Sequence, residues 1–579
     1  MDLYSMYLIN VKALLGREGG METREQVDCR AKVLELRDDE VTEYAILSHR
    51  WGEQEVGYEE IVELAKMDEE KRAEIRRRDG YRKILDSCKQ AEKDGYEWLW
   101  ADTCCIDKRS SAELSEAINS MYRWYENAQV CYAYLHDVLD SSFPVARNYE
   151  RHSANGWPEW FSCGWTLQEM MAPTNVQFFN KEWQHIGDKR MLAWTLQEIT
   201  GVPTYILTNG LDTHRPCVAQ IMSWAANRTT SRVEDRAYSL MGLLGVNMPM
   251  LYGEGKKAFH RLQLEIIRTS NDQSIFAWSW HEPVRTGNIL ADDPSVFRSC
   301  SEMELMDPDE FIESLRPLPA GVLPSSDQLG TFPITNRGIQ IWLFLRPALD
   351  DSVFEAWLPC RPSPIWNREP VTINLYLRGS NYYRFPWSLR SRPLLGTLQF
   401  RQVYLRYQDT SYRKAAFDID DSAITERGFT CHSTYPVKFR GNSFILTTDP
   451  LCVRVYSNDD TSDCFAVGFG EFFGKDWIHV EPDIHREEGA RYEYVKMLAR
   501  APEYERSMEK TRSEARVCIM QTHLRQLTLH TCVVWKGLRD SRVKLEVFQD
   551  PSVGCVSGEW TSFDVDVGGI FRVCALLPY

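Results

Sequence analysis

A single carboxylate, Glu169, stands on an apolar stretch that has the pattern of a short helix. The stretch runs from Trp160 to Pro173 with the sequence WFSCGWTLQEMMAP, and its apolar residues recur at helical spacing before the proline ends the helix. Trp165 and Glu169 are four residues apart, so they share one face of that helix. Residues 175–179 then have the pattern of a short buried strand. A carboxylate in such a setting either pairs with another group or does chemistry, and Glu169 is therefore our candidate catalytic residue.

Three further short apolar runs predict strands of the same sheet as residues 176–179. They are Tyr44–Ser48, Trp98–Asp102 and Val130–Leu135, and charged segments with helical spacing separate them. Alternation of short buried strands with helices predicts an α/β domain whose sheet is mainly parallel and is covered on both faces. Ligands of such sheets bind at the carboxyl ends of the strands, so the loops after these strands should hold the site. Residues 30–36 predict a further strand at an edge.

Composition places the chain among ordinary globular proteins. Apolar residues make up 43% and charged residues 26% of the 579 residues, and the net charge of −16 argues against a protein built to coat nucleic acid or an anionic membrane. No run of about 18 apolar residues predicts a membrane span, and the amino terminus lacks the pattern of a signal peptide. We therefore expect a cytoplasmic protein with no membrane or nucleic-acid partner.

The 16 cysteines and 12 histidines form no recognisable metal or redox motif. Neither a C-x-x-C pair nor a His pair with metalloprotease spacing occurs, so we expect reduced cysteines, no metal site and no bound cofactor. The adjacent Cys104 and Cys105 should pack as small buried apolar residues. The segment Gly253–Lys257 resembles a phosphate-binding loop, but the required positions lack the earlier glycine and the final serine or threonine.

The pentapeptide Trp-Thr-Leu-Gln-Glu occurs twice, at 165–169 and at 194–198, and so carries little weight alone. Only the first copy lies between two predicted buried strands. We therefore expect Glu198 to be an ordinary helix residue, which makes it a natural control for Glu169. The segment Glu234–Arg236 is expected to form an internal ion-pair network that docks the helical region around it.

The pattern of the sequence divides the chain into five parts. Residues 1–39 precede the first domain as a leader, residues 40–185 form the α/β domain, and residues 186–285 are a mostly helical extension. Residues 286–330, rich in Pro, Asp and Ser, are a predicted linker. From 331 to 579 the pattern changes to period-two alternation in many short strands, which predicts a β-rich sandwich or barrel-like domain of unknown role.

Several long blocks, in order, resemble the signature blocks of the fungal heterokaryon-incompatibility (HET) domain. They cover roughly residues 40–280 and read YAILSHRWG at 44–52, LWADTCCID at 99–107, GWTLQE at 164–169, EDRAYSLMG at 234–242, LYGEG at 251–255 and FAW at 276–278. Lys108 departs from the family, in which many members carry Gln. The resemblance implies an intracellular protein of non-self recognition that triggers cell death.

HET domains in turn look like distant relatives of Toll/interleukin-1 receptor (TIR) domains, which have a flavodoxin-like parallel sheet. That likeness places Trp165–Glu169 on the helix whose Trp-Cys-x-x-Glu pattern carries the NAD-cleaving glutamate, with Thr166 in place of the Cys. It puts Ser48 at the end of the first strand and Asp102 on the second. The resemblance thus implies a TIR-like fold and hydrolysis of NAD, as a substrate, to nicotinamide and an ADP-ribose-type product, with Glu169 as the catalytic residue.

The chemistry of NAD suits a lone carboxylate. Hydrolysis of an ordinary glycoside needs a second, acidic group to protonate the leaving oxygen, whereas nicotinamide leaves NAD as a neutral molecule without a general acid. One carboxylate can then stabilise the positive charge that develops on the ribose. Trp51 and Trp165 could supply stacking faces and Arg50 could contact a phosphate. Our predicted substrate-binding residues are therefore Ser48, Arg50, Trp51, Asp102 and Trp165.

Other roles remain open for these residues. Glu169 could instead be a structural carboxylate that pairs with Arg50 or with a backbone N–H, and Ser48 and Asp102 could form hydrogen bonds at strand ends. The domain could equally be a non-catalytic module that induces death by self-association, and residues 331–579 could bind a ligand or partner and hold it inactive. An exposed Glu169 in a cleft would favour catalysis, and a buried, fully paired Glu169 would favour structure.

Overall fold

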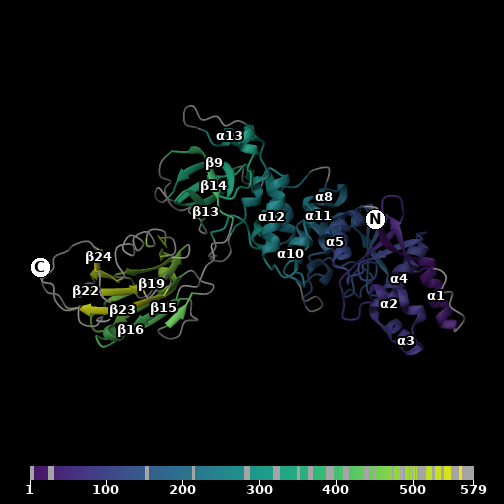
Figure 1. Ribbon diagram of the computed structural model, residues 1–579, viewed down its shortest axis with the longest axis horizontal. Helices are drawn as coiled ribbons and strands as arrows, with labels where there is room; N and C mark the ends of the chain where they lie inside the picture. Colours follow the sequence, from purple (N-terminus) through teal and green to yellow (C-terminus); the bar gives the residue numbers. More distant parts are fainter. Residues whose placement is uncertain are drawn as a thin grey trace. The chain divides into compact units, whose positions relative to one another are not determined.

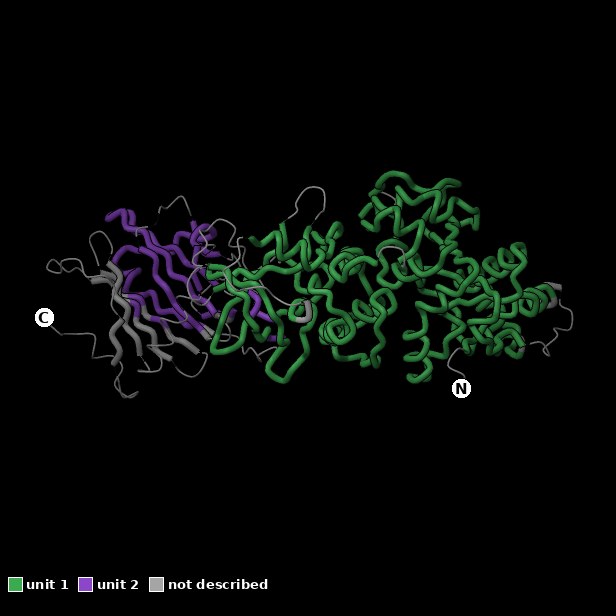
Figure 2. The backbone as a smooth tube through the Cα atoms, turned by 90° about the horizontal axis from the view of Figure 1, so that it is seen from above, with its two compact units in different colours: residues 1–279, 289–382, 393–405 green, residues 280–288, 383–392, 406–579 purple. Residues whose placement is uncertain are grey.

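The computed structural model describes most of the chain (Figure 1). The described residues are 5–23, 32–149, 155–211, 215–279, 287–316, 326–348, 353–362, 369–385, 397–407, 416–435, 443–446, 451–472, 475–482, 484, 489–494, 496–497, 500–501, 504, 517–523, 528–535, 540–548 and 560–563. The chain divides into two compact units (Figure 2). The first comprises residues 1–279, 289–382 and 393–405, and the second comprises residues 280–288, 383–392 and 406–579.

The first unit contains a seven-stranded sheet at whose centre four neighbouring strands run parallel. In sequence order its strands are β1 (Ser5–Asn10), β2 (Leu34–Asp38), β3 (Ala45–His49), β4 (Trp98–Ala101), β5 (Val130–Tyr134), β6 (Val176–Phe179) and β7 (His185–Asp188). Their order across the sheet is β2-β1-β4-β3-β5-β6-β7, and β1, β2 and β7 join antiparallel at the two sides. All residues of β3 and β4 are buried, as expected of parallel strands that are covered on both faces.

Helices link these strands. They are α1 (Val11–Thr23), α2 (Tyr58–Glu63), η1 (Leu64–Lys66), α3 (Glu69–Arg77), α4 (Asp79–Lys93), α5 (Ser111–Asn127), η2 (Glu159–Ser162) and α6 (Thr166–Met171). The chain passes from β3 to β4 in one direction and from β4 to β5 in the other, so right-handed crossovers place α4 and α5 on opposite faces of the sheet. Accordingly α4 contacts β4 and α1, whereas α5 contacts α6, which also contacts β3. The reversal lies between β3 and β5, where α/β sheets bind ligands.

A mostly helical region follows β7 in the first unit. Its elements are α7 (Ala193–Thr200), α8 (Thr204–Asn209), α9 (Val218–Ala225), α10 (Asp235–Tyr238), α11 (Met241–Leu244), α12 (Lys257–Thr269), η3 (Gln273–Phe276), η4 (Pro294–Cys300), β8 (Glu304–Leu305), α13 (Pro308–Ser314) and α14 (Ser326–Gly330). The last four of these lie within residues 286–330, the part of the chain that the composition suggests is a linker. Phe297 in η4 and Phe311 in α13 are nevertheless fully buried, so this segment belongs to the packed structure.

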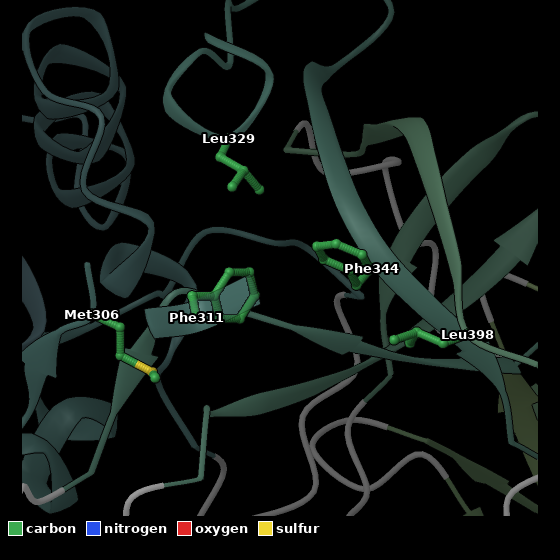
Figure 3. Packing of buried hydrophobic residues seen from close by; sticks show 5 residues of the cluster. All are labelled: Met306, Phe311, Leu329, Phe344 and Leu398. Atoms are coloured by element: carbon green, nitrogen blue, oxygen red, sulfur yellow. The ribbon is translucent and has the colours of Figure 1, made fainter. Parts of the chain in front are cut away.

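A small closed barrel completes the first unit. Its strands are β9 (Ile339–Pro347), β10 (Val353–Trp357), β12 (Thr372–Arg378), β13 (Asn381–Arg384) and β14 (Gln399–Leu405), and the short β11 (Cys360–Arg361) pairs with β8 instead. One apolar cluster joins the barrel strands to the preceding helices, and Figure 3 shows its members Met306, Phe311, Leu329, Phe344 and Leu398. The rings of Phe311 and Phe344 lie 5.9 Å apart in an edge-to-face contact, which aromatic pairs prefer.

The second unit is built from two sheets. Its elements are β15 (Ala416–Asp420), α15 (Ser422–Thr425), β16 (Phe429–Tyr435), β17 (Ser443–Ile445), β18 (Leu451–Asn458), β19 (Cys464–Phe472), β20 (Lys475–Glu481), β21 (Val517–His523), β22 (Thr528–Trp535), β23 (Asp540–Phe548) and β24 (Trp560–Phe563). One sheet has the order β17-β15-β23-β22-β21-β24 and the other the order β16-β18-β19-β20. Phe469 of the second sheet lies 5.8 Å from both Phe417 and Phe444 of the first, so aromatic side chains connect the two sheets.

The structure confirms the predicted α/β class, the mainly parallel sheet and the β-rich C-terminal region. The four predicted strands correspond to β3, β4, β5 and β6, and the predicted edge strand corresponds to β2. Residues 1–39, predicted as a leader, contribute β1, α1 and β2 to the same unit, because β1 pairs with β4. The likeness to TIR domains stays a prediction. Among the described helices none combines the length and the apolar character that a membrane crossing requires.

Candidate functional site

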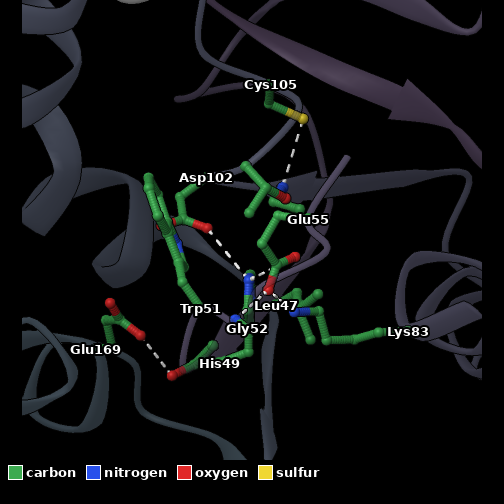
Figure 4. Close-up of polar contacts among 12 residues, drawn as sticks. Leu47, His49, Trp51, Gly52, Glu55, Lys83, Asp102, Cys105 and Glu169 are labelled. Carbon is green, nitrogen blue, oxygen red and sulfur yellow. Dashed lines mark hydrogen bonds and ion pairs between the residues drawn. The ribbon is translucent and has the colours of Figure 1, made fainter. Parts of the chain in front are cut away.

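Glu169 lies on α6, and its side chain is buried against the carboxyl end of β3. Its Oε2 accepts a hydrogen bond of 2.5 Å from Ser48 Oγ, and that hydroxyl accepts one of 2.9 Å from Trp160 Nε1. Figure 4 shows the bond from Glu169 as a dashed line. Ser48 and Trp160 are fully buried, and only 4% of Glu169 is exposed. All six residues of α6 are buried, so no face of this helix is exposed to solvent and the carboxyl group of Glu169 points into the protein.

Burial dominates the protonation of Glu169. It raises the pKa of the carboxyl group to about 8, and the negative charge of Asp102 acts in the same direction. The hydrogen bond from Ser48, the nearby hydroxyl of Tyr125 and the positive charge of Arg228 lower the pKa and oppose this effect in part. The carboxyl group is therefore mostly protonated at neutral pH in this conformation, because desolvation disfavours its charged form.

Two buried cations fix the ends of α6. Arg228 Nη1 donates to Thr166 Oγ1 at 2.9 Å, where the helix begins, and Lys189 Nζ donates to Met170 O at 3.2 Å, near its end. Arg228 is 3% and Lys189 4% exposed. The last carbonyl groups of a helix lack hydrogen-bond donors within the helix, so the buried ammonium group of Lys189 supplies a donor to one of them. The position of Glu169 thus depends on residues well beyond its own helix.

A second group of buried polar residues lies on the other face of β3, because successive side chains of a strand point to opposite faces. His49 Nε2 lies 3.7 Å from Asp102 Oδ1 and 3.9 Å from Glu55 Oε2. Lys83 Nζ contacts Glu55 Oε1 at 2.6 Å, and Trp51 Nε1 donates to Asp102 Oδ2 at 2.6 Å (Figure 4). This group occupies the carboxyl ends of β3 and β4, where the sequence predicts a site.

Burial also sets the charges in this second group. It holds the pKa of His49 well below its ordinary value, and the positive charges of Lys83 and Lys108 add to this effect. Burial raises the pKa of Asp102, and Lys108 and the bond from Trp51 oppose that rise. The imidazole of His49 is therefore neutral at physiological pH.

A cavity of about 380 Å³ opens at the loops that follow β3 and β4. Its walls include Trp51, Glu55, Tyr58, Thr103, Lys108 and Arg109. Trp51 is 52% exposed, and Lys108 Nζ lies 3.8 Å from the centre of its ring, in a cation–π contact. A cavity of this size can hold a small molecule. Neither Ser48 nor Glu169 belongs to its lining.

The structure brings the predicted site residues together only in part. Ser48 contacts Glu169, and Trp51 contacts Asp102, as two separate pairs. Arg50 instead forms an ion pair with Glu159 at 2.7 Å and a long hydrogen bond with Ser162, so the structural pairing considered between Arg50 and Glu169 is not seen. Trp165 acts instead on Asp235 of the helical extension, where its side chain opposes the rise that burial causes in the pKa of that carboxyl group.

The Glu234–Arg236 segment forms an internal polar network, but among the described residues only Arg236 makes an ion pair in it, so the predicted ion-pair network is seen in part. Glu234 Oε1 accepts from the backbone N–H groups of Gly253 at 2.8 Å and Gly255 at 3.0 Å. These glycines have φ of 101° and 60°, so the phosphate-like loop is a left-handed turn that binds a carboxylate of its own chain. Arg236 forms two hydrogen bonds with Asp293, at 3.0 and 2.8 Å.

The control residues behave as expected. Glu198 is exposed on α7, in contrast to the buried Glu169. Cys104 is fully buried and Cys105 is 3% exposed, and burial holds the pKa of the Cys105 thiol well above its ordinary value. Within the described part of the chain, no set of three or more His, Cys, Asp or Glu residues is arranged to hold a metal ion.

Sequence reasoning did not assign a role to several residues of the site. Tyr125 and Trp160 are aromatic residues whose polar atoms meet Leu47 O and Ser48 Oγ, and their buried helical positions alone gave no sign of this. Glu55 follows the predicted loop and looks like a surface charge. Arg228 lies outside every block used to recognise the family, so no local signal could have identified it.

The geometry defines a class of protein: an α/β domain that buries a carboxyl–hydroxyl pair at the carboxyl end of a parallel strand. Residues 44–198 match the family described as heterokaryon incompatibility protein (HET), and residues 257–290 match a domain of unknown function (DUF8212). The chain is 40% identical over 268 residues to vegetative incompatibility protein HET-E-1 of Podospora anserina, a match that covers 44% of this chain and 18% of that protein. The chain therefore carries a HET domain at residues 44–198. It spans less than a fifth of the length of that relative.

Solved structures also show similarity to part of the chain. Wild-type lectin XCL of Xerocomus chrysenteron and a mutant of it each match 24% of this chain, and 99% and 100% of their own. Their TM-scores are 0.18 and 0.19, and both are 10% identical in sequence. A likeness at this level carries no functional argument.

Proposed function

We propose that this chain acts in heterokaryon incompatibility, a response to non-self, and that its HET domain hydrolyses NAD at Glu169. The observation that carries the proposal is the buried Glu169–Ser48 pair at the carboxyl end of β3, beside the reversal point of the sheet. A carboxyl group whose pKa is raised to about 8 by burial and a neighbouring charge is typical of functional sites. The HET domain at residues 44–198 supports the same proposal.

The proposed reaction breaks the bond between the nicotinamide nitrogen and the ribose carbon. Nicotinamide leaves with the bonding electron pair as a neutral molecule, and the ribose carbon becomes oxocarbenium-like. The ionised carboxylate of Glu169 stabilises this positive charge directly or through a ribose hydroxyl. Water then adds to the ribose carbon and releases one proton, so the products are nicotinamide, ADP-ribose and a proton. Ser48 would orient the carboxylate, and Trp51 and Lys108 would line the neighbouring cavity.

The second candidate function is a non-catalytic module that induces death by self-association. The observation that favours it is the burial of Glu169, because a buried and hydrogen-bonded carboxyl group is the pattern of a structural residue. In that case residues 331–579 would bind an unknown ligand or partner and control the assembly. For NAD hydrolysis, by contrast, the contact between Glu169 and Ser48 must open so that substrate reaches the carboxylate.

The test is NAD consumption with nicotinamide release by the purified full chain, at concentrations that allow self-association. Glu169→Gln keeps the size of the side chain and an acceptor for Ser48, so it should fold, yet it should lower turnover by about 10²-fold or more, as expected for one key electrostatic group. Glu198→Gln, at an exposed glutamate in the same pentapeptide, should leave turnover unchanged. Equal turnover by wild type and Glu169→Gln would reject Glu169, and no turnover by a self-associating wild type would favour the second candidate.

A further inference from the structure

The start of α6 is built by a segment that lies beyond the residues matched to the HET family. Gly164 N donates to Thr229 O at 2.8 Å, and Thr229 N donates to Ser162 O at 2.7 Å. These bonds form a parallel bridge between Cys163 and Thr229. A Cβ atom at Gly164 would lie 2.5 Å from Thr230 Cγ2, so only glycine permits this close approach. The backbone that leads into α6 is therefore clamped by residues 228–230.

Arg228 is the charged residue of this clamp. Its Nη1 donates to Cys163 O at 2.8 Å and to Thr166 Oγ1 at 2.9 Å. Thr166 precedes Glu169 by three residues, so the two lie on the same side of α6, one turn apart. Arg228 Nη2 is buried and has no hydrogen-bond partner among the described residues. A buried guanidinium with an unused donor is costly, which indicates that its charge serves a neighbouring group.

The side chain of Arg236 holds the backbone at Arg228 in place. Arg236 Nη1 donates to the backbone carbonyl of Arg228 and to Ala225 O at 3.1 Å. The same Arg236 forms the two-bonded ion pair with Asp293. Paired bonds of this kind fix direction as well as distance. These bonds therefore fix the backbone position from which the Arg228 side chain reaches the start of α6.

The charges that face Glu169 come from every element packed around it. Asp102 after β4 disfavours its ionised form, whereas Arg228 and the hydroxyl of Tyr125 on α5 favour it. The thiols of Cys131 on β5 and of Cys163 also face the carboxyl group, and burial together with Glu169 raises the pKa of both, so they stay neutral. Burial lowers the pKa of Arg228 only to about 10, so its guanidinium stays charged at neutral pH.

We infer that Arg228 is a positioning residue of the Glu169 site: it fixes the start of α6 and supplies the positive charge that Glu169 needs in order to ionise. The functional unit therefore extends beyond residues 44–198 to include residues 228–236. The effect of Arg228 on the ionisation of Glu169 can be tested without the proposed function. Only its effect on turnover rests on that function.

Lys189 provides a matched control. It is a buried cation of similar exposure that also donates to the backbone of α6, but at the opposite end, and its charge is not among the groups that shift Glu169. Arg228→Met and Lys189→Met each replace a buried cation by an apolar side chain of similar length. If Arg228 had only a structural role, both variants should show the same titration midpoint for Glu169.

The first measurement is the ionisation of Glu169 in the folded full chain, from the infrared band of its protonated carboxyl group, identified by its loss in Glu169→Gln. Arg228→Met should move the titration midpoint upward, by up to about one pH unit, because it removes a positive charge that favours the ionised form. Lys189→Met should leave it in place. An unchanged midpoint in folded Arg228→Met would overturn the inference, whether or not the protein hydrolyses NAD.

Turnover gives the second measurement. If the chain hydrolyses NAD, the pH at which nicotinamide release reaches half its maximum should rise in Arg228→Met by the same amount as the infrared midpoint, and not in Lys189→Met. If Arg228→Met is too unstable for this titration, the double variant Arg228→Met/Glu169→Gln completes a mutant cycle in exchange protection around α6. Because Glu169→Gln alone should already stabilise the protein at pH 7, coupling requires a different gain in the Arg228→Met background than in wild type, and an equal gain would overturn the inference.

Discussion

Replacement of Glu169 by glutamine should make the stability of the HET domain less dependent on pH. In the unfolded chain this carboxyl group loses its proton near the ordinary value of 4.5, whereas in the folded chain it does so near 8. A group whose folded pKa is raised contributes its full stability below the lower value and loses it as pH rises through the higher one. The interval from 4.5 to about 8 corresponds to about 5 kcal/mol, at about 1.4 kcal/mol for each tenfold change in proton affinity.

The comparison of wild type with Glu169→Gln should therefore change with pH. At pH 5 the two should be nearly equal, because the amide replaces a protonated carboxyl group of the same shape. By pH 7 the variant should be more stable by about 3 kcal/mol, and above pH 8 by up to about 5 kcal/mol. Ser48 Oγ can still donate to the amide oxygen, so the bond seen at 2.5 Å has a counterpart in the variant.

Hydrogen exchange of the full chain is the suitable assay, because a protein with several domains has no single free energy of unfolding. Peptides that contain β3 and α6 report opening of this site, and peptides from β18 and β19 in the second unit serve as an internal reference. A difference between the two proteins that stays constant from pH 5 to pH 9 would refute the reasoning. It would show that Glu169 titrates at its ordinary value and that water reaches the site in solution.

Two further substitutions test the packing around this carboxyl group. Ser48→Ala removes the donor to Glu169 in a fully buried position, so exchange protection around β3 should fall by about 1–3 kcal/mol, and protection equal to wild type would show that the bond contributes nothing. Gly164→Ala places a Cβ atom 2.5 Å from the methyl group of Thr230 and should lower exchange protection around α6 by about 1–3 kcal/mol. Gly57→Ala, with no atom within 4 Å, should leave that protection unchanged, and equal protection in the two variants would contradict the close approach.

The four parallel strands could be predicted because each of them carries its own local signal. The strands β3 to β6 are short apolar runs bounded by turn residues, and parallel strands buried on both faces must be apolar throughout. The boundary of the first unit could not be predicted in the same way. The polar composition of residues 286–330 hides the buried Phe297 and Phe311, because a few large side chains suffice to anchor a segment that is otherwise polar.

The partners of the site residues were also beyond the reach of local patterns. Ser48 and Glu169 are separated by 121 positions, and nothing near either residue indicates the other. Arg50 lies only two residues after Ser48, yet its partner is Glu159 of η2 and not Glu169. Which polar groups meet is decided by the three-dimensional packing of segments that the sequence keeps apart.

If the proposed hydrolysis of NAD holds, the closed state of Glu169 describes an inactive form of the site. With a pKa of about 8, only about a tenth of the carboxyl groups are ionised at pH 7, and those remain shielded from substrate. A movement that exposes the carboxyl group to water would return its pKa toward 4.5, because desolvation is the main cause of the raised value, so the same movement that admits NAD would also ionise nearly every carboxyl group. A signal that stabilises the open form, such as self-association, would then change access and charge together, because a ligand or partner shifts a conformational equilibrium by its preference for one state. If NAD hydrolysis is confirmed, turnover should therefore rise more steeply with protein concentration at pH 6 than at pH 9, where ionisation no longer limits the closed form.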